Sequence, residues 1–351
     1  MADYAHEQTD LIIARTQRRI EREYLKVVKE VEAELDDYLR RFEKKDEKWR
    51  EWVRDGKKTQ EQYKNWKRQQ IAAGKVWQEL KEGLAVDYHN ANLIAKRIVK
   101  NTMPEIYALN HNYGTYLIER GLMMDTAYAL YSRHAVDKIL RDNPDLLPPP
   151  GKKVSERIAE GLDIRWNKRK IQSVMIQSIL KGEAIHKIAK RLAREVGDSN
   201  FKASIRNART MATGAQNAGR NDSFRRAQNM GISLRRTWVA TLDMRTRHEH
   251  RLLDGMTVGA DEPFEVDGYK IRFPGDPNAP GHLVYNCRCT MIAQIMGFER
   301  DVVGLRADPA LGDMTYEEWK RSKNAKSNPI TLPYEKGQAI RHKYIQEYRT
   351  L

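Results

Sequence analysis

A narrow apolar stripe between residues 8 and 48 restricts the fold more than any other feature of the chain. Its apolar residues recur at spacings of three, four and seven: Ile13, Ile20, Tyr24, Val27, Val31, Leu35, Tyr38 and Phe42. Almost every other position is charged or polar, so only one thin face can be buried. The pattern predicts one long helix that packs against a neighbouring helix or in a coiled coil.

Helical periodicity continues beyond this segment, with interruptions. Asp55-Gly56 breaks the pattern, and Pro104 suits the first turn of a new helix. Asp198-Ser199 resembles a helix cap, and the proline-rich stretch 143–151 reads as a linker. The four tryptophans of the first part are expected to hold a helical hairpin together: Trp49, Trp52, Trp66 and Trp77. Further helices are expected over 60–84, 88–101, 104–121, 125–140, 153–181, 185–197 and 201–230.

The period changes to that of a strand at Leu234. Residues 234–241 alternate like a strand, and segments around Phe264, 269–273 and 283–292 are candidates to pair with it. The expected fold is mainly α, with a long N-terminal helical arm and a helical middle region followed by a small α+β C-terminal module. The corresponding domains are 1–87 (elongated helical arm), 88–197 (helical domain), 198–296 (α+β module) and 297–351 (basic C-terminal tail).

Positive charge is concentrated in two stretches of this basic chain. The formal net charge is +15. Residues 200–251 hold eleven Lys and Arg against three Asp and Glu, and residues 320–351 hold eight against two. Such a balance favours a polyanionic partner, and double-stranded DNA is the first candidate. The residues expected to contact DNA are Lys202, Arg206, Arg209, Arg220, Arg225, Arg226, Arg235 and Arg236.

Targeting signals and membrane segments are not expected. The chain has no run of about 18 apolar residues, so a membrane partner is not predicted. The N-terminus lacks the basic and apolar regions of a secretory signal. Two cysteines do not form an extracellular disulfide framework, and a bridge across one intervening residue would be strained. These features predict a protein made in a reducing cytoplasm.

Two short clusters carry the chemically distinctive residues. One runs from Asp243 to His250, and the other is Asn286-Cys287-Arg288-Cys289, which contains both cysteines of the chain. Zinc prefers Cys thiolates and His nitrogens in a tetrahedral shell. One interpretation is therefore a structural zinc site, the only cofactor considered, with the ligands His250, His282, Cys287 and Cys289.

The other interpretation is a folding motif without metal. Cys287 and Cys289 would alternate into a small core, and His250 would hydrogen-bond a backbone carbonyl. Bidentate Arg–carboxylate bonds would lock the corner after the strand. The motif residues in this view are Trp238, Asp243, Arg245, Arg247, His250, Asp254, Gly255, Asn286, Cys287, Arg288 and Cys289.

An enzymatic use of the same residues is the alternative function. Glu249 or Asp254 could act as a general base in a metal-dependent nuclease, and a cysteine with His250 or His282 could form a nucleophilic pair. No carboxylate cluster has the spacing of a two-metal site. The chain is therefore expected not to be an enzyme.

An ordered set of these motifs resembles the phage Mu F-like head-morphogenesis (minor capsid) proteins. The resemblance covers about 200–293. It rests on Arg209-Thr210, Asn217-Ala218-Gly219-Arg220, Gly231, Trp238-Val239-Ala240, Asp243-x-Arg245-Thr246-Arg247-x-x-His250, Leu253-Asp254-Gly255, Pro274-Gly275-Asp276-Pro277 and Asn286-Cys287-Arg288-Cys289.

The resemblance implies a minor head protein of a tailed phage. Such a protein is expected in the virion, and in the host cytoplasm during assembly. It implies association with the portal protein and with the major capsid or scaffolding protein. It also implies a link to DNA during head assembly, packaging or ejection. The helical part before about residue 200 lies outside the resemblance.

Overall fold

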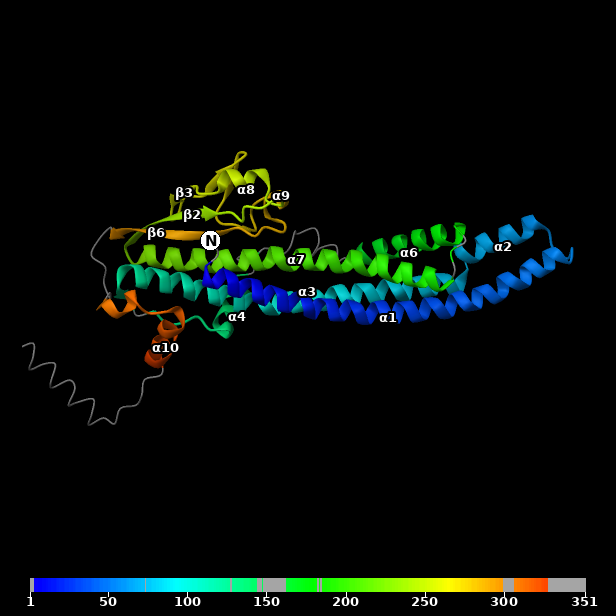
Figure 1. The fold of residues 1–351 in the computed structure, drawn as a ribbon, viewed down its shortest axis with the longest axis horizontal. Coiled ribbons are helices and arrows are strands. Elements are labelled where there is room, and N and C mark those ends of the chain that lie inside the picture. Colours follow the sequence, from blue (N-terminus) through cyan, green and yellow to red (C-terminus); the bar gives the residue numbers. More distant parts are fainter. Residues whose placement is uncertain are drawn as a thin grey trace, which may run out of the picture.

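Three long helices lie side by side and form an elongated bundle, here called the shaft (Figure 1). They are α1 (Tyr4–Arg54), α3 (Lys75–Leu122) and α7 (Ile185–Asn229). The shorter helices α2 (Gln60–Ala72), α4 (Arg133–Asp142) and α6 (Leu162–Leu180) accompany them. The computed structural model describes residues 3–72, 74–126, 128–143, 147, 162–181, 183, 185–298 and 306–327.

The apolar stripe of α1 is buried against α3 and α7, as the periodicity predicts. Ile20, Val31 and Leu35 are fully buried along it. Towards the end of α1 that is remote from the N-terminus, the indole of Trp66 on α2 stacks on Phe42 and Trp49 of α1, with ring centroids 5.8 and 5.1 Å apart. These aromatic contacts join α1 to α2, in the packing role expected for the tryptophans.

Two glycines bring α3 and α7 into close contact. A Cβ atom at Gly219 of α7 would lie 2.5 Å from the carbonyl oxygen of Tyr107 on α3. One at Gly114 of α3 would lie 2.1 Å from the hydroxyl of Ser223 on α7. The small-residue face of α7 therefore lets the two backbones approach more closely than larger side chains permit.

Several expected helix boundaries are wrong. Helix α3 runs from Lys75 to Leu122 without the breaks expected near residues 84–88 and 101–104, and the helix expected from residue 125 begins at Arg133. Residues 153–161 of the helix expected over 153–181 lie outside the described residues. Pro104 lies inside α3, and Asp198-Ser199 lies inside α7. Pro104 is buried within the bundle. Tertiary packing of the long helices outweighs the local preference of these residues for a helix start.

The C-terminal module is a small antiparallel sheet with short helices, and it lies against α7 (Figure 1). Strand β2 (Ile232–Val239) is central, between β3 (Thr257–Gly259) and β6 (Thr290–Phe298). The strands β4 (Phe264–Val266) and β5 (Tyr269–Ile271) pair with each other, so the expectation that these two segments pair with β2 is wrong. Helices α8 (His248–Leu253) and α9 (Gly281–Val284) complete the module. The mainly α fold with a small α+β module is thus confirmed.

Residues 306–327 pack on another part of the shaft. Strand β7 (Arg306–Ala307) pairs with β1 (Met124–Asp125), and a 3-10 turn (Pro309–Gly312) leads to α10 (Tyr316–Ser327). The buried Lys323 of α10 donates to Glu119 of α3 at 2.8 Å. Two parts of the expected basic tail, 299–305 and 328–351, lie outside the described residues, as does most of the 143–151 linker. The four domain ranges stay predictions. No helix in the described part of the chain combines the length and apolar character of a transmembrane span.

Candidate functional site

Residues 286–291, here called the cysteine segment, are held against α7 by a row of four side chains. Residues 210, 213, 217 and 220 recur at spacings of three and four, which places them on one face of the helix. Each bonds to the backbone of the segment: Thr210 Oγ1 accepts from Asn286 N (2.8 Å), Thr213 Oγ1 donates to Cys287 O (2.5 Å), Asn217 Nδ2 donates to Cys289 O (3.0 Å), and Arg220 Nη1 donates to Met291 O (3.0 Å).

This row was not predicted from the sequence. Arg220 was expected to contact DNA, and no structural role was expected for the two threonines. The available signal was the spacing of polar residues on the buried side of an otherwise small-residue helix. Asn286, at φ 55°, turns the chain so that the cysteine segment can run along α7.

The corner after β2 is locked by ion pairs between Asp243 and two arginines, Arg245 at 3.5 Å and Arg288 at shorter range. Arg288 donates to both carboxylate oxygens of Asp243, at 2.5 and 2.7 Å. This bond holds the pKa of Asp243 well below its ordinary value. Arg245 contributes its backbone N–H to Asp243 at 2.8 Å, and Arg247 donates to the carbonyl of Tyr285.

Other motif residues complete the same corner. Asp254 accepts from the backbone N–H of Ala240 at 2.8 Å. Gly255 has a φ of 76°, which favours glycine at this turn. The buried Trp238 lies edge-on to His250 and to Phe264. These contacts join the motif residues in one corner, and their folding role stays a prediction.

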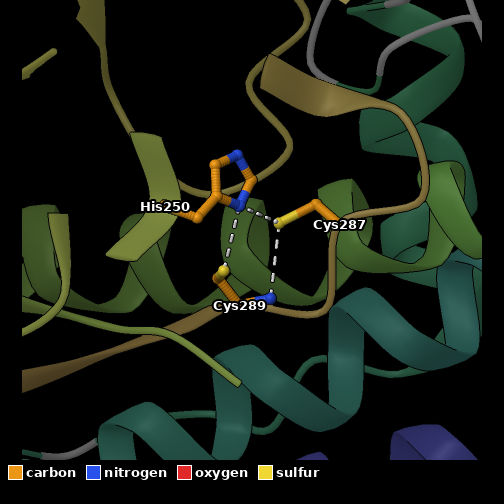
Figure 2. Close-up of side chains that lie close together, drawn as sticks. All are labelled: His250, Cys287 and Cys289. Carbon is orange, nitrogen blue, oxygen red and sulfur yellow. Dashed lines mark hydrogen bonds between the residues drawn. The ribbon is translucent and has the colours of Figure 1, made fainter. Parts of the chain in front are cut away.

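His250, Cys287 and Cys289 converge inside the module (Figure 2). Nδ1 of His250 lies 3.2 Å from Sγ of Cys289 and 3.6 Å from Sγ of Cys287. One ligand atom from each of the three buried residues falls within 4.8 Å of the others. His282 does not belong to this group: it is exposed and lies edge-on to Tyr269.

The hydrogen bond between the two cysteines shifts the pKa values of their thiols in opposite directions. The hydrogen bond from Cys287, aided by His250, lowers the pKa of Cys289. The same bond and burial raise the pKa of Cys287. The cluster therefore favours a state in which Cys289 is the thiolate.

A basic groove runs between α1 and α7 beside the cysteine segment. Two adjoining hollows of about 650 and 250 Å³ share Ala14, Gln17 and Arg209. The larger is lined by Arg18, Lys202 and Arg206 as well. We define the basic groove by Arg18, Lys202, Arg206 and Arg209, none of which forms an ion pair with any described residue.

The structure divides the residues that were expected to contact DNA. Lys202, Arg206 and Arg209 line the basic groove, which Arg18 joins from a helix almost 200 positions earlier. Arg225, Arg226 and Arg235 are exposed outside it. Arg220 and Arg236 are buried, and both donate to groups within the protein. We therefore leave these two arginines out of the proposed DNA-binding surface.

Comparison with known proteins indicates the class of protein to which this chain is related. Residues 169–292 match the family described as Phage Mu protein F like protein, so the resemblance seen in the sequence is confirmed. The minor head protein GP7 of Bacillus phage SPP1 is 25% identical over 325 residues, which cover 90% of this chain and 95% of that protein. Together these findings support a role in phage head morphogenesis.

A second relative carries an enzyme's name. The NAD(+)–arginine ADP-ribosyltransferase EFV of Enterococcus faecalis is 30% identical over 177 residues, which cover 49% of this chain. The chain spans only 35% of that protein's length. No solved structure matches the chain.

Proposed function

We propose that the protein is a structural component of a phage head that binds double-stranded DNA through the basic groove. The observation that carries this proposal is the set of four cations, unpaired among the described residues, that line one groove between α1 and α7. Clustered Lys and Arg side chains neutralise backbone phosphates and release their counterions. Phe201 is the aromatic residue in the lining of the larger hollow, so phosphate contacts outweigh base stacking there.

DNA affinity and its salt dependence test this groove. If four phosphates are neutralised, log affinity falls with log salt at a slope of roughly −3.6. Replacing Lys202, Arg206 and Arg209 with alanine is expected to weaken binding and to make this slope shallower by about 2 to 3. Fluorescence anisotropy with a labelled duplex, from low to physiological salt, measures both quantities.

A matched variant separates the groove from net charge. Lys187, Lys190 and Arg194 are three exposed cations on the same helix, outside the groove. Their replacement with alanine removes the same charge and is expected to change the affinity much less. Equal losses from the two triple variants, or no DNA binding by the unaltered protein at low salt, overturn the proposal.

The proposed partners within the head are the portal protein and the major capsid or scaffolding protein. The match to the SPP1 minor head protein extends over nearly the whole of both chains, so it includes the shaft as well as the module. We place the protein in the virion, and in the host cytoplasm while heads assemble. Mass spectrometry of purified virions and co-purification with the portal test these two statements; absence from particles contradicts them.

We propose that this role involves no catalysis. In the described residues, the group of potential metal ligands consists of one histidine and two cysteines without a carboxylate. Mg²⁺ and Mn²⁺ favour oxygen ligands, which this donor set does not offer. Incubation of the protein with plasmid DNA in Mg²⁺, Mn²⁺ or Zn²⁺ is expected to leave the plasmid intact. Cleavage that is lost in His250→Ala supports the nuclease alternative instead.

A further inference from the structure

We propose that His250, Cys287 and Cys289 bind one zinc ion, which fastens α8 to the cysteine segment. With zinc–sulfur and zinc–nitrogen bonds of about 2.3 and 2.0 Å, a tetrahedral site places N and S about 3.5 Å apart. The two distances from Nδ1 of His250 to the sulfurs are 3.2 and 3.6 Å. The donor atoms are thus already close to the separations that a shared ion requires.

The orientation of the imidazole supports a ligand role. Nε2 of His250 lies 2.9 Å from the carbonyl oxygen of Leu283. A carbonyl can only accept, so Nε2 carries the proton and the lone pair of the neutral ring is at Nδ1, which faces both sulfurs (Figure 2). A backbone carbonyl that orients the distal nitrogen is the usual second partner of a zinc-bound histidine.

The extended backbone of the cysteine segment directs both sulfurs to the same side. In an extended chain, alternate side chains point to the same side. Cys287 and Cys289 therefore face His250 together, while Arg288 between them reaches Asp243. The backbone N–H of Cys289 also donates to Sγ of Cys287 at 3.3 Å, and this interaction stabilises a thiolate.

With a neutral His250, a metal-free core explains the burial of these residues but not the approach of both sulfurs to Nδ1. The single lone pair of Nδ1 can accept a hydrogen bond from one thiol, yet two sulfurs converge on it. A cation between the three atoms satisfies all of them at once. The donor set of two thiolates and one imidazole is the one that zinc favours over Mg²⁺ or Ca²⁺.

The fourth ligand is expected to be a small non-protein molecule such as water. No other His, Cys, Asp or Glu in the described ranges belongs to the group. His282, the fourth ligand suggested by the sequence, lies on the exposed side of α9. The hollow of about 250 Å³ is lined in part by Cys287, so it offers a path from solvent towards the site.

Metal analysis of the full-length protein tests the site. Protein purified without chelator is expected to contain about one zinc per chain, because such a site loads during folding. Cys287→Ser, Cys289→Ser and His250→Ala are each expected to lower this content at least several-fold. His282→Ala is the matched control, since it also removes a histidine of this region, and it is expected to retain the metal.

Cobalt substitution keeps the test decisive if a variant fails to fold. The unaltered protein, stripped of metal and reduced, is expected to bind one Co²⁺ per chain with the intense thiolate charge-transfer band of a cysteine-ligated ion. X-ray absorption is expected to show two sulfur ligands on the bound metal. Folded protein with two titratable thiols that takes up neither zinc nor cobalt overturns the proposal, as does retention of zinc by both cysteine variants.

Discussion

The shaft and the module are stabilised by different kinds of contact. In the shaft, apolar side chains at helical spacing meet across α1, α3 and α7, with Ile20 and Leu35 fully buried. In the module, short strands depend on side chains that bond to backbone groups distant in sequence, as Thr213 does with Cys287. A helix satisfies its own backbone, whereas short irregular segments need outside partners. Hydrogen bonds from specific polar side chains therefore matter most where helices and strands are shortest.

Arg220 is the point at which the two regions meet. Its guanidinium donates to Asn110 of α3 at 3.1 Å, to Met291 of β6 at 3.0 Å, and to Asp3 before α1 at 2.5 Å. The side chain is buried, so each of these acceptors depends on it. Substitutions on either side of this junction test whether the shaft and the module depend on different kinds of contact.

The largest effect is expected from Arg220→Met. Removing one partner of a buried ionic network destabilises by about 3 to 5 kcal/mol, because the remaining polar groups stay buried. Protection from hydrogen exchange is expected to fall in both α1 and β6. Arg225→Ala, an exposed arginine of the same helix, is the control and should change little. A loss of protection confined to the module contradicts the role of Arg220 as a junction.

A purely apolar truncation in the shaft is expected to rank next. Leu35→Ala leaves a cavity in the apolar core between α1, α3, α6 and α7 and should cost about 3 kcal/mol. The exposed Leu25, at 52% of its accessible surface, provides the matched substitution Leu25→Ala with a small effect. Thermal unfolding and hydrogen exchange compare the two. If Leu35→Ala lowers protection from hydrogen exchange as much in the module as in the shaft, the two regions are not stabilised by separate kinds of contact.

The fold of the shaft was easier to predict from the sequence than the contacts of the module. The periodicity of α1 predicted its burial, because a helix repeats one local rule over 51 residues. The boundaries at Pro104 and Asp198 were wrong, since neighbouring helices override local preference. The motif predicted a locked corner but not Arg288 as the partner of Asp243, because pairing depends on the path of the chain between them. His282 was grouped with the cysteines by proximity in sequence, while the structure turns it outward.

The contact of a loop with α7 gives a mid-sized effect in the module. Gly275 has a φ of 81°, and a Cβ there would lie 2.8 Å from the backbone nitrogen of Gly214. Gly275→Ala is expected to cost about 2 to 3 kcal/mol, because backbone strain of about 1 to 2 kcal/mol is joined by a backbone clash. Gly268, with a φ of 77° and open space, isolates the strain alone. Equal destabilisation in Gly268→Ala and Gly275→Ala, measured by thermal unfolding, shows that the approach to α7 has no effect.

The smallest effect is expected from Asp243→Asn, which weakens the pair with Arg288 at the surface of the module. This pair lowers the pKa of Asp243 in the folded state, so its stabilisation is fully present above the ordinary carboxyl pKa of 3.8. It declines as the pH falls from there towards the lowered value. The difference in unfolding free energy between the unaltered protein and the variant should therefore be constant near neutral pH and shrink in acid. Solvent screening keeps it small, and added salt should reduce it further.

Urea unfolding at several pH values measures the difference, with Asp37→Asn on the exposed face of α1 as the control. A difference that grows in acid has the wrong sign for a carboxylate stabilised by Arg288, and it would remove this pair from the contacts that define the module.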